Sequence, residues 1–141
     1  MWYNVFMQAL LKSPLHGLLS RNLILIRYTG RKSGKTITLP VNYVRIGDRL
    51  LVTSLRTRSW WRNLRRAAPF HLRLQGNEVP ARAEVLEEQA EVAAALGELF
   101  AAAPQMSRYF DVRLDENQKP LQGDLEQAAR ERVVVRIQPG V

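Results

Sequence analysis

The chain has 141 residues, of which 46% are hydrophobic, and it contains no cysteine. This length and composition predict a single soluble domain over residues 1–141 with a real core. The lack of cysteine excludes a disulfide framework, an iron–sulfur cluster and a thiol nucleophile, and it fits a cytoplasmic location. Only His16 and His71 offer imidazole, and neither lies in an acidic cluster, so we expect no metal centre.

The net charge of +8 is unevenly distributed. Residues 1–75 contain fourteen Lys and Arg against one acid, a net +13, whereas residues 76–141 contain seven against twelve, a net −5. Such a positive field attracts anionic partners: nucleic acid, anionic lipid or a polyanionic cofactor. Charge alone does not choose among them.

The N-terminal segment 1–12 is uncharged up to Leu11 and predicts a short amphipathic helix, because its apolar residues recur at spacings near three and four. We expect no signal peptide, and the segment is too short to span a bilayer. The helix is expected to pack on its own domain. The alternative is an interfacial anchor that gives peripheral membrane contact.

Two predicted strands, residues 23–29 and 36–46, flank a basic loop bounded by glycines. The glycines allow positive φ angles that turn backbone N–H groups toward an anion, and the cations and the hydroxyl add donors suited to phosphate. The pattern predicts a hairpin that binds a phosphorylated ligand. The alternative is a turn whose cations remain in water. The loop residues are Gly30, Arg31, Lys32, Ser33, Gly34 and Lys35.

The remaining elements predict an antiparallel barrel or a strongly curved sheet, with two packed sheets as the alternative. Pro40 cannot donate to a ladder and therefore indicates an edge or a bulge, which can leave room for a ligand. Ser59 is the predicted cap of the short helix. The expected elements are strand 49–55, helix 59–67, hairpin 70–75 and 78–86, helix 87–103, a long surface loop or insertion over 111–129 with a short helical end as the alternative, and strand 133–137.

Four motifs in this order resemble the deazaflavin-dependent nitroreductase family: Thr29 to Lys35, Leu39-Pro40-Val41, Gly47-Asp48 and Trp60-Trp61-Arg62-Asn63-Leu64. The likeness runs from about Trp2 to Tyr109. It implies an α+β fold, a split antiparallel β-barrel like that of FMN-binding reductases, with an N-terminal helix, a short Trp-containing helix and one long helix. By analogy with related barrels, it also makes a homodimer plausible.

The resemblance implies a site for the deazaflavin coenzyme F-420. The basic loop would hold the phosphate and acidic tail, Pro40 and Asn42 would flank the coenzyme, and Ser54 would lie near the ring. Trp60 and Asn63 match residues at the deazaflavin, where a tryptophan face and an amide suit a flat ring with carbonyls. The loop before Trp60 is shorter than in the family, and Arg56 and Arg58 are the replacements for its lysine.

The implied activity is hydride transfer from the reduced coenzyme to a quinone, nitroaromatic or activated alkene, with Tyr109 as a proton donor. In the alternative interpretations, Tyr109 is an aromatic at the edge of the core, Trp60 and Trp61 close the barrel, and Asn63 bonds to backbone. The alternative from another class is a nucleic-acid-binding barrel, which explains the charge but not the compact glycine-bounded loop or the ordered likeness to the family. A third possibility is a non-catalytic family member that binds FMN or haem.

Overall fold

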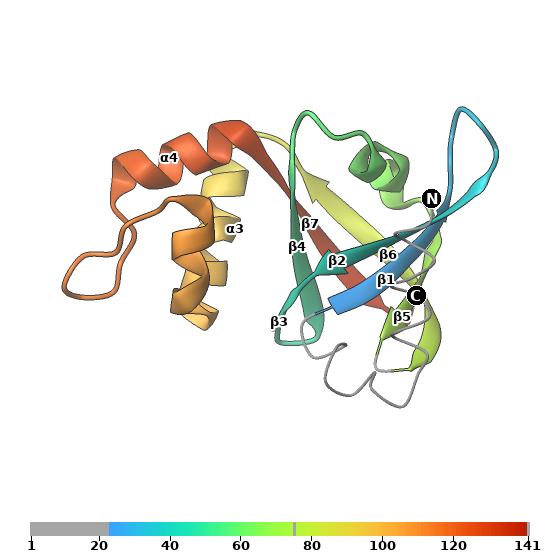
Figure 1. The fold of residues 1–141 in the computed structure, drawn as a ribbon, viewed down its shortest axis with the longest axis horizontal. Helices are drawn as coiled ribbons and strands as arrows, with labels where there is room; N and C mark the ends of the chain where they lie inside the picture. Colours follow the sequence, from blue (N-terminus) through green and yellow to red (C-terminus); the bar gives the residue numbers. More distant parts are fainter. Residues whose placement is uncertain (1–22, 75, 141) are drawn as a thin grey trace.

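The computed structural model describes residues 23–74 and 76–140 and shows one antiparallel sheet of seven strands in the order β2-β1-β5-β6-β7-β4-β3 (Figure 1). The predicted N-terminal helix lies outside the described residues. No helix in the described part of the chain has the length and apolar character needed to cross a membrane. The strands are β1 (Leu23–Thr29), β2 (Thr36–Asn42), β3 (Val44–Ile46), β4 (Arg49–Leu55), β5 (Phe70–Leu74), β6 (Asn77–Leu86) and β7 (Arg132–Pro139).

The sheet curls because its two edge strands, β2 and β3, are consecutive in the chain. Only Tyr43 separates them, so the chain crosses directly from one edge of the sheet to the other. The sequence pattern predicted a single strand over 36–46, and the structure divides it at this residue. The outcome is a barrel left open between two edges, which confirms the predicted α+β split barrel and rules out two packed sheets.

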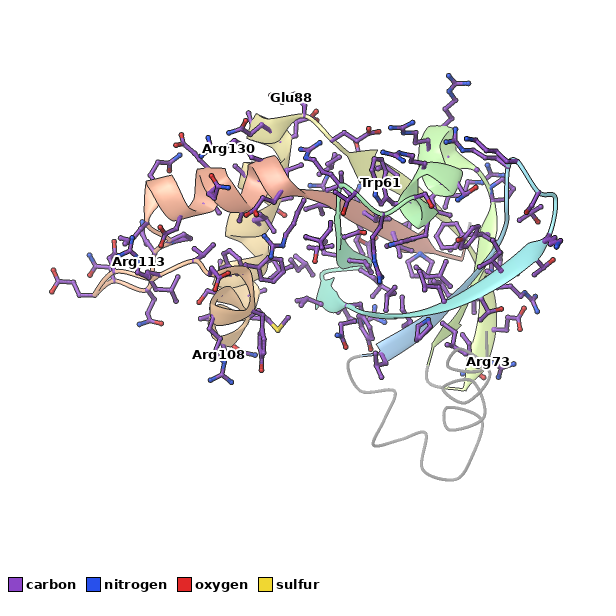
Figure 2. The ribbon with its side chains drawn as sticks, turned by 45° about the horizontal axis from the view of Figure 1, so that its top comes forward. Trp61, Arg73, Glu88, Arg108, Arg113 and Arg130 are labelled. Carbon is purple, nitrogen blue, oxygen red and sulfur yellow. The ribbon has the colours of Figure 1, made fainter. Side chains whose placement is uncertain are left out.

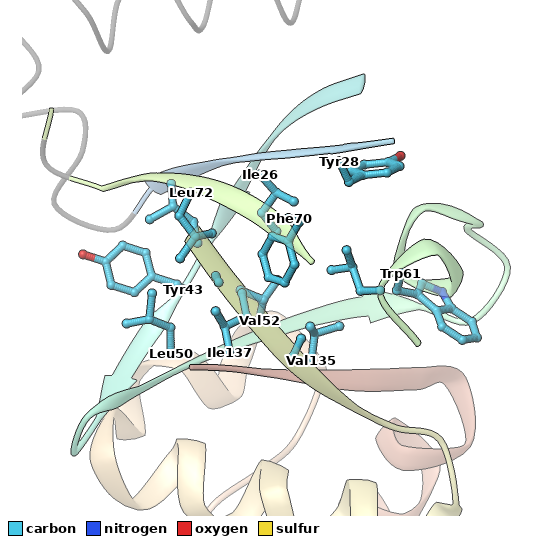
Figure 3. Packing of buried hydrophobic residues seen from close by; sticks show 14 of the residues in the cluster. Ile26, Tyr28, Tyr43, Leu50, Val52, Trp61, Phe70, Leu72, Val135 and Ile137 are labelled. Atoms are coloured by element: carbon cyan, nitrogen blue, oxygen red, sulfur yellow. The ribbon is translucent and has the colours of Figure 1, made fainter. Parts of the chain in front are cut away.

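The inside of the barrel is filled by alternate side chains from the strands (Figure 3). Ile24 and Ile26 of β1, Leu50 and Val52 of β4, and Leu72 of β5 are 0–1% exposed. Because successive strand residues point to opposite faces, the residues that alternate with these face the outside of the barrel. Figure 3 shows Trp61 at one end of this core and Tyr43 at the other.

A helical layer covers the outer face of β4, β6 and β7 (Figure 1). Its ordered elements are α3 (Gln89–Ala102), the 3-10 helix η2 (Pro104–Phe110) and α4 (Gln122–Glu131). Val92, Leu96 and Phe100 of α3 are 0% exposed and pack in one cluster with Leu51 and Val134 of the sheet. Phe110 meets Phe100 edge-on, with ring centroids 5.3 Å apart, and this contact holds η2 on α3.

The segment 111–129, expected as a long surface loop with a short helical end as the alternative, does end in a helix, α4. Pro120 and Gly123 suggested a loop, but Pro120 precedes the helix, where its missing N–H breaks no intrahelical hydrogen bond, and Gly123 lies in the first turn rather than in the helix interior. Ala128 and Ala129, which are 1% and 0% exposed, provide the face that packs against the rest of the helical layer. The loop is therefore confined to residues 111–121.

The short helix η1 (Trp60–Ala67) is a 3-10 helix that breaks at Arg65 and Arg66. Ser59 occupies the cap position as predicted, but its side chain makes no capping hydrogen bond. A two-pronged ion pair holds the helix instead. Arg65 donates from Nε and Nη2 to the Glu87 carboxylate at 2.9 and 2.6 Å, and these hydrogen bonds lower the pKa of Glu87.

Candidate functional site

A cleft of about 1070 Å³ opens where the barrel is split. One wall is the edge of β2, the opposite wall is the end of β4, and η2 closes a third side. The cleft contains five residues that the sequence analysis assigned to a site: Pro40, Asn42, Ser54, Trp60 and Tyr109. Residues far apart in the chain therefore meet at one opening.

The β4 wall exposes backbone hydrogen-bonding groups to the cleft. The Arg56 N–H donates to the Glu131 carbonyl at 3.0 Å, across the paired residues Leu55 and Arg132. In an antiparallel ladder this bond means that Leu55, and two residues earlier Thr53, turn their backbone groups away from β7. The partner strand on that side, β3, ends its pairing opposite Leu51. Thr53 N–H and C=O and Leu55 N–H are therefore available to a ligand.

The β2 wall has the same property. The Gly30 N–H donates to the Lys35 carbonyl at 2.8 Å, and counting in steps of two along the β1–β2 ladder places Pro40 and Asn42 with their backbone groups facing away from β1. Pro40 therefore occupies a position where the ladder needs no N–H. β2 is an edge strand, as Pro40 predicted. The Pro40 carbonyl and both backbone groups of Asn42 face the opening.

Trp60 and Ser54 form the inner end of the cleft. Trp60 Nε1 donates to Ser54 Oγ at 3.0 Å, and each residue is only 7% exposed. Trp61 points into the barrel core, donates from Nε1 to the Leu55 carbonyl at 3.3 Å, and has the guanidinium groups of Arg62 and Arg65 about 5 Å from its ring. Both tryptophans belong to the barrel core, as the alternative interpretation had it, and Trp60 in addition lines the cleft. Figure 2 shows Trp61 near η1, far from Arg113 in the 111–121 loop.

The basic loop is a compact turn that does not line the cleft. Gly34 N–H donates to the Gly30 carbonyl at 2.8 Å, and Lys35 N–H donates to Ser33 Oγ at 3.2 Å. Gly34 has φ +69°, which favours glycine, and a Cβ on Gly30 would lie 2.7 Å from Ser33 Oγ and displace this hydroxyl from the Lys35 N–H. The side chains of Arg31, Lys32 and Lys35 are exposed, and no carboxylate of the described residues forms a salt bridge with them.

Three hydrogen bonds in series connect this loop to the cleft. Arg31 N–H donates to Asn63 Oδ1 at 2.9 Å, Asn63 Nδ2 donates to the Trp60 carbonyl at 3.0 Å, and Trp60 Nε1 donates to Ser54 Oγ. Both ends of the Asn63 amide are therefore bonded to backbone, as the alternative interpretation of this residue had it. Asn63 positions the loop and the tryptophan relative to one another.

Tyr109 lies at the mouth of the cleft. It is 64% exposed, the Arg108 guanidinium stacks 5.2 Å from its ring centroid, and Arg108 Nη2 donates to its hydroxyl at 3.4 Å. Ala103 and Met106, from the same end of the helical layer, line the cleft beside it. The hydroxyl can reach both solvent and a ligand in the opening.

Arginines gather in the cleft, which the sequence pattern did not predict. Arg45, Arg58 and Arg132 all line it, and no Asp or Glu does so among the described residues. Arg56, the other replacement considered for the family's lysine, instead donates to the backbone carbonyls of Glu87 and Ala129 at 2.6 and 3.1 Å. Arg58 is therefore the member of that pair that can touch a ligand. No local motif identifies Arg45 or Arg132.

Comparison with solved structures supports the fold. A protein of Bacteroides thetaiotaomicron VPI-5482, named as a candidate for 5-nitroimidazole antibiotic resistance, aligns over 88% of this chain and 76% of its own with 13% identity and a TM-score of 0.56. A protein solved as a domain-swapped dimer aligns over 96% of both chains with 17% identity and a TM-score of 0.52. A conserved hypothetical protein of Mycobacterium tuberculosis aligns over 88% of this chain and 78% of its own with 16% identity and a TM-score of 0.51.

Sequence comparison identifies the family. The comparison with curated proteins gives no match. The family model described as F420H(2)-dependent quinone reductase matches residues 5–119, which include the basic loop, both cleft walls and Tyr109. This match confirms the predicted deazaflavin-dependent family and its coenzyme. The chain belongs to the F420H(2)-dependent quinone reductase family.

Proposed function

We propose that the chain binds the reduced deazaflavin coenzyme with its acidic tail at the basic loop and its ring in the cleft, and that it reduces a small electron-poor acceptor, with quinones first among the candidates. The observation that carries the proposal is the series of hydrogen bonds from Arg31 through Asn63 and Trp60 to Ser54. It links an exposed cationic loop to an aromatic-walled cleft, which are the two environments that a charged tail and a flat ring require.

The residues present fit such a coenzyme. Arg31, Lys32 and Lys35 would hold the phosphate and carboxylates, because charge-assisted hydrogen bonds are the strong ones and these cations have no carboxylate partner among the described residues. Ser33 is a further candidate at the tail. The ring bears carbonyl and N–H groups on its edge. It would find matching donors and acceptors on the backbone of Asn42 and Thr53, with the indole of Trp60 as a flat surface.

When bound, the reduced coenzyme supplies a hydride, and a quinone that receives this hydride needs one further proton to become a hydroquinone. The chain has to orient the reactants and limit water around them. Leu55, Met106 and Phe110 provide apolar surface on the η2 side of the cleft. Tyr109 is our proposed proton donor, and since its side chain is 64% exposed, solvent can restore its proton.

The burial of the tryptophans argues against a nucleic-acid-binding barrel. Binding of single strands without sequence preference uses aromatic faces on which bases stack. Trp61 is 2% exposed, and Trp60, which is 7% exposed, faces the cleft, so the pair offers no open surface along which successive bases of a strand can stack. The remaining cations serve a compact polyanion as well as they serve a nucleic acid.

The function is tested by anaerobic mixing of the protein with reduced coenzyme and menadione, following the fluorescence of the oxidised coenzyme. We expect turnover that depends on the protein and saturates with both substrates. Binding of oxidised coenzyme, and of FMN as the alternative, is measured in parallel by titration. Tight binding of FMN with no binding of the deazaflavin would overturn the assignment.

We further propose that residues 1–141 act as one domain in the cytoplasm and form a homodimer. The absence of cysteine is compatible with a reducing compartment. The edge strands β2 and β3 provide surfaces on which a second copy could assemble. Light scattering coupled to gel filtration tests the dimer, and a monomer at micromolar concentration would contradict it.

A further inference from the structure

The η2 side of the cleft has no role in holding the coenzyme under the proposed function. We call it the acceptor wall and define it as Leu55, Ala103, Met106, Tyr109 and Phe110. Its surface is mainly apolar and aromatic. This is the place left for the molecule that is reduced.

Arg132 adds a cation to this apolar wall. It is the first residue of β7 and pairs with Leu55 across the ladder, and its guanidinium carbon lies 4.8 Å from the Phe110 ring centroid. Its side chain is only 16% exposed. Its salt-bridge partner is Glu131, with Nη1 and Oε1 at 3.9 Å, beyond hydrogen-bonding distance, and the Glu131 side chain is 54% exposed. The guanidinium donates no hydrogen bond to the described residues, so its planar set of donors is available.

The rest of the cleft strengthens this preference for anions. Arg45 and Arg58 also line it, and no Asp or Glu of the described residues does. Three cations in one partly enclosed cleft favour a negatively charged guest, since low-dielectric walls concentrate the field. Arg45 and Arg58 are exposed to solvent, so Arg132, whose side chain is 16% exposed, is the cation that a neutral quinone or nitro compound would leave without a hydrogen-bonded partner.

We propose that the physiological acceptor carries a carboxylate on its planar ring and that Arg132 binds this carboxylate. The inference rests on the proposed function, because it names the class of acceptor for the same site. A guanidinium meets a carboxylate through two parallel N–H···O bonds, which also fix the plane of the ring. The carboxylate is not altered in the reaction: the quinone or nitro group of the acceptor takes the hydride and the additional proton.

The test uses 4-nitrobenzoate and 4-nitrobenzamide, two probes of nearly the same shape that differ in charge. Their binding to the protein is measured by quenching of tryptophan fluorescence and by calorimetry. We expect the acid to bind about tenfold tighter than the amide, the scale of a charge-assisted hydrogen bond. In R132Q the preference should disappear, and in R132K a part of it should remain. R136Q is the matched control, because Arg136 lies on the same strand and pairs with Glu84 at 2.9 Å, outside the cleft.

Coenzyme titrations with the same variants separate this proposal from the function on which it rests. We expect R132Q to bind the oxidised deazaflavin with unchanged affinity. Equal binding of both probes to the wild type overturns the proposal, and so does a loss of coenzyme affinity in R132Q as large as its loss for 4-nitrobenzoate, since Arg132 would then hold the coenzyme. If the wild type fails to bind the coenzyme yet prefers the acid, the proposed function fails and the anion site stands.

Discussion

Two exposed loops of this molecule, residues 30–35 and 111–121, are both ordered by hydrogen bonds. They differ in whether ionised side chains make those hydrogen bonds. In the 111–121 loop, Arg113 donates to both carboxylate oxygens of Asp124, at 2.8 and 3.1 Å, and Asp115 Oδ1 accepts from the backbone N–H groups of Asn117 and Lys119. In the 30–35 loop, the hydrogen bonds are made by the backbone and Ser33.

The difference shows how a binding loop is distinguished from a structural one. In the 111–121 loop, ionised side chains stabilise the chain itself. In the 30–35 loop, the turn is formed without them, so Arg31, Lys32 and Lys35 are left free for an external anion. Cations that have no carboxylate partner among the described residues, more than the glycines, are the reason for proposing an anion site at this loop.

The largest expected effect follows from removing two cations of the 30–35 loop in K32A/K35A. We expect the Kd of the coenzyme to rise about 30-fold at low salt, a loss of about 2 kcal/mol for two exposed charge-assisted contacts, with unchanged thermal stability. This increase in Kd should become smaller at higher salt, because salt screens the attraction between the loop of the wild type and the coenzyme. The matched control is K119A/R130A, which removes two exposed cations from the opposite region and should leave the Kd unchanged. A similar loss in both double variants would contradict a specific role for the loop.

Uncoupling the loop from the cleft is the next test. In N63A, Arg31 N–H and the Trp60 carbonyl lose their side-chain partner. We expect a fall of about 1 kcal/mol in the free energy of unfolding and about tenfold weaker coenzyme binding, because the loop is no longer held in register with Trp60. Urea denaturation and coenzyme titration measure the two effects. Unchanged coenzyme affinity would show that the tail does not depend on this connection.

A smaller effect is expected from W60F, which keeps an aromatic face in the cleft but removes the hydrogen bond to Ser54 Oγ. Leaving that hydroxyl without its donor should lower the free energy of unfolding by about 1 kcal/mol and weaken coenzyme binding about three- to fivefold. S54A is the companion variant, since it leaves the indole N–H unpaired instead. A loss of coenzyme affinity of more than a hundredfold in either variant would contradict this account. It would mean that Trp60 or Ser54 bonds directly to the coenzyme.

The smallest effect concerns acid stability and the 111–121 loop. Hydrogen bonds from Arg113 lower the pKa of Asp124 from 3.8 to about 2. The ionised carboxylate therefore contributes stability above about pH 4, and this contribution is lost as the pH falls through about 2. In D124N the free energy of unfolding should lack this fall between about pH 4 and about pH 2. Coenzyme binding at pH 7 should be unchanged. Denaturation curves at pH 5, 3 and 2 measure the difference between variant and wild type.

The elements that the sequence predicted well are those with local signals. Gly34 and Gly47 have φ +69° and +64° at turns between consecutive strands, where the glycine pattern placed them. The helix α3 and the strand β4 follow directly from composition and apolar spacing. The basic loop belongs to the same class, because its turn, its cations and its flanking strands are contiguous in sequence.

The rest of the site could not be predicted because topology creates it. The free backbone groups of Thr53 and Asn42 exist only because β3 is short and Tyr43 carries the chain from one edge of the sheet to the other. Arg132 meets Leu55 through strand pairing across more than half of the chain. The helix α4 was predicted only as a short helical end of a loop, since Pro120 and Gly123 disfavour a helix interior, whereas they lie before it and in its first turn.

The central claim is that the 30–35 loop binds the charged tail of the coenzyme while the cleft binds its ring. The most direct measurement compares the Kd of the complete coenzyme with that of the deazaflavin chromophore lacking phosphate and glutamates, for the wild type and K32A/K35A. The account predicts that the wild type prefers the complete coenzyme by about 30-fold, that the variant loses this preference, and that both bind the chromophore equally. A preference that survives in K32A/K35A would contradict it.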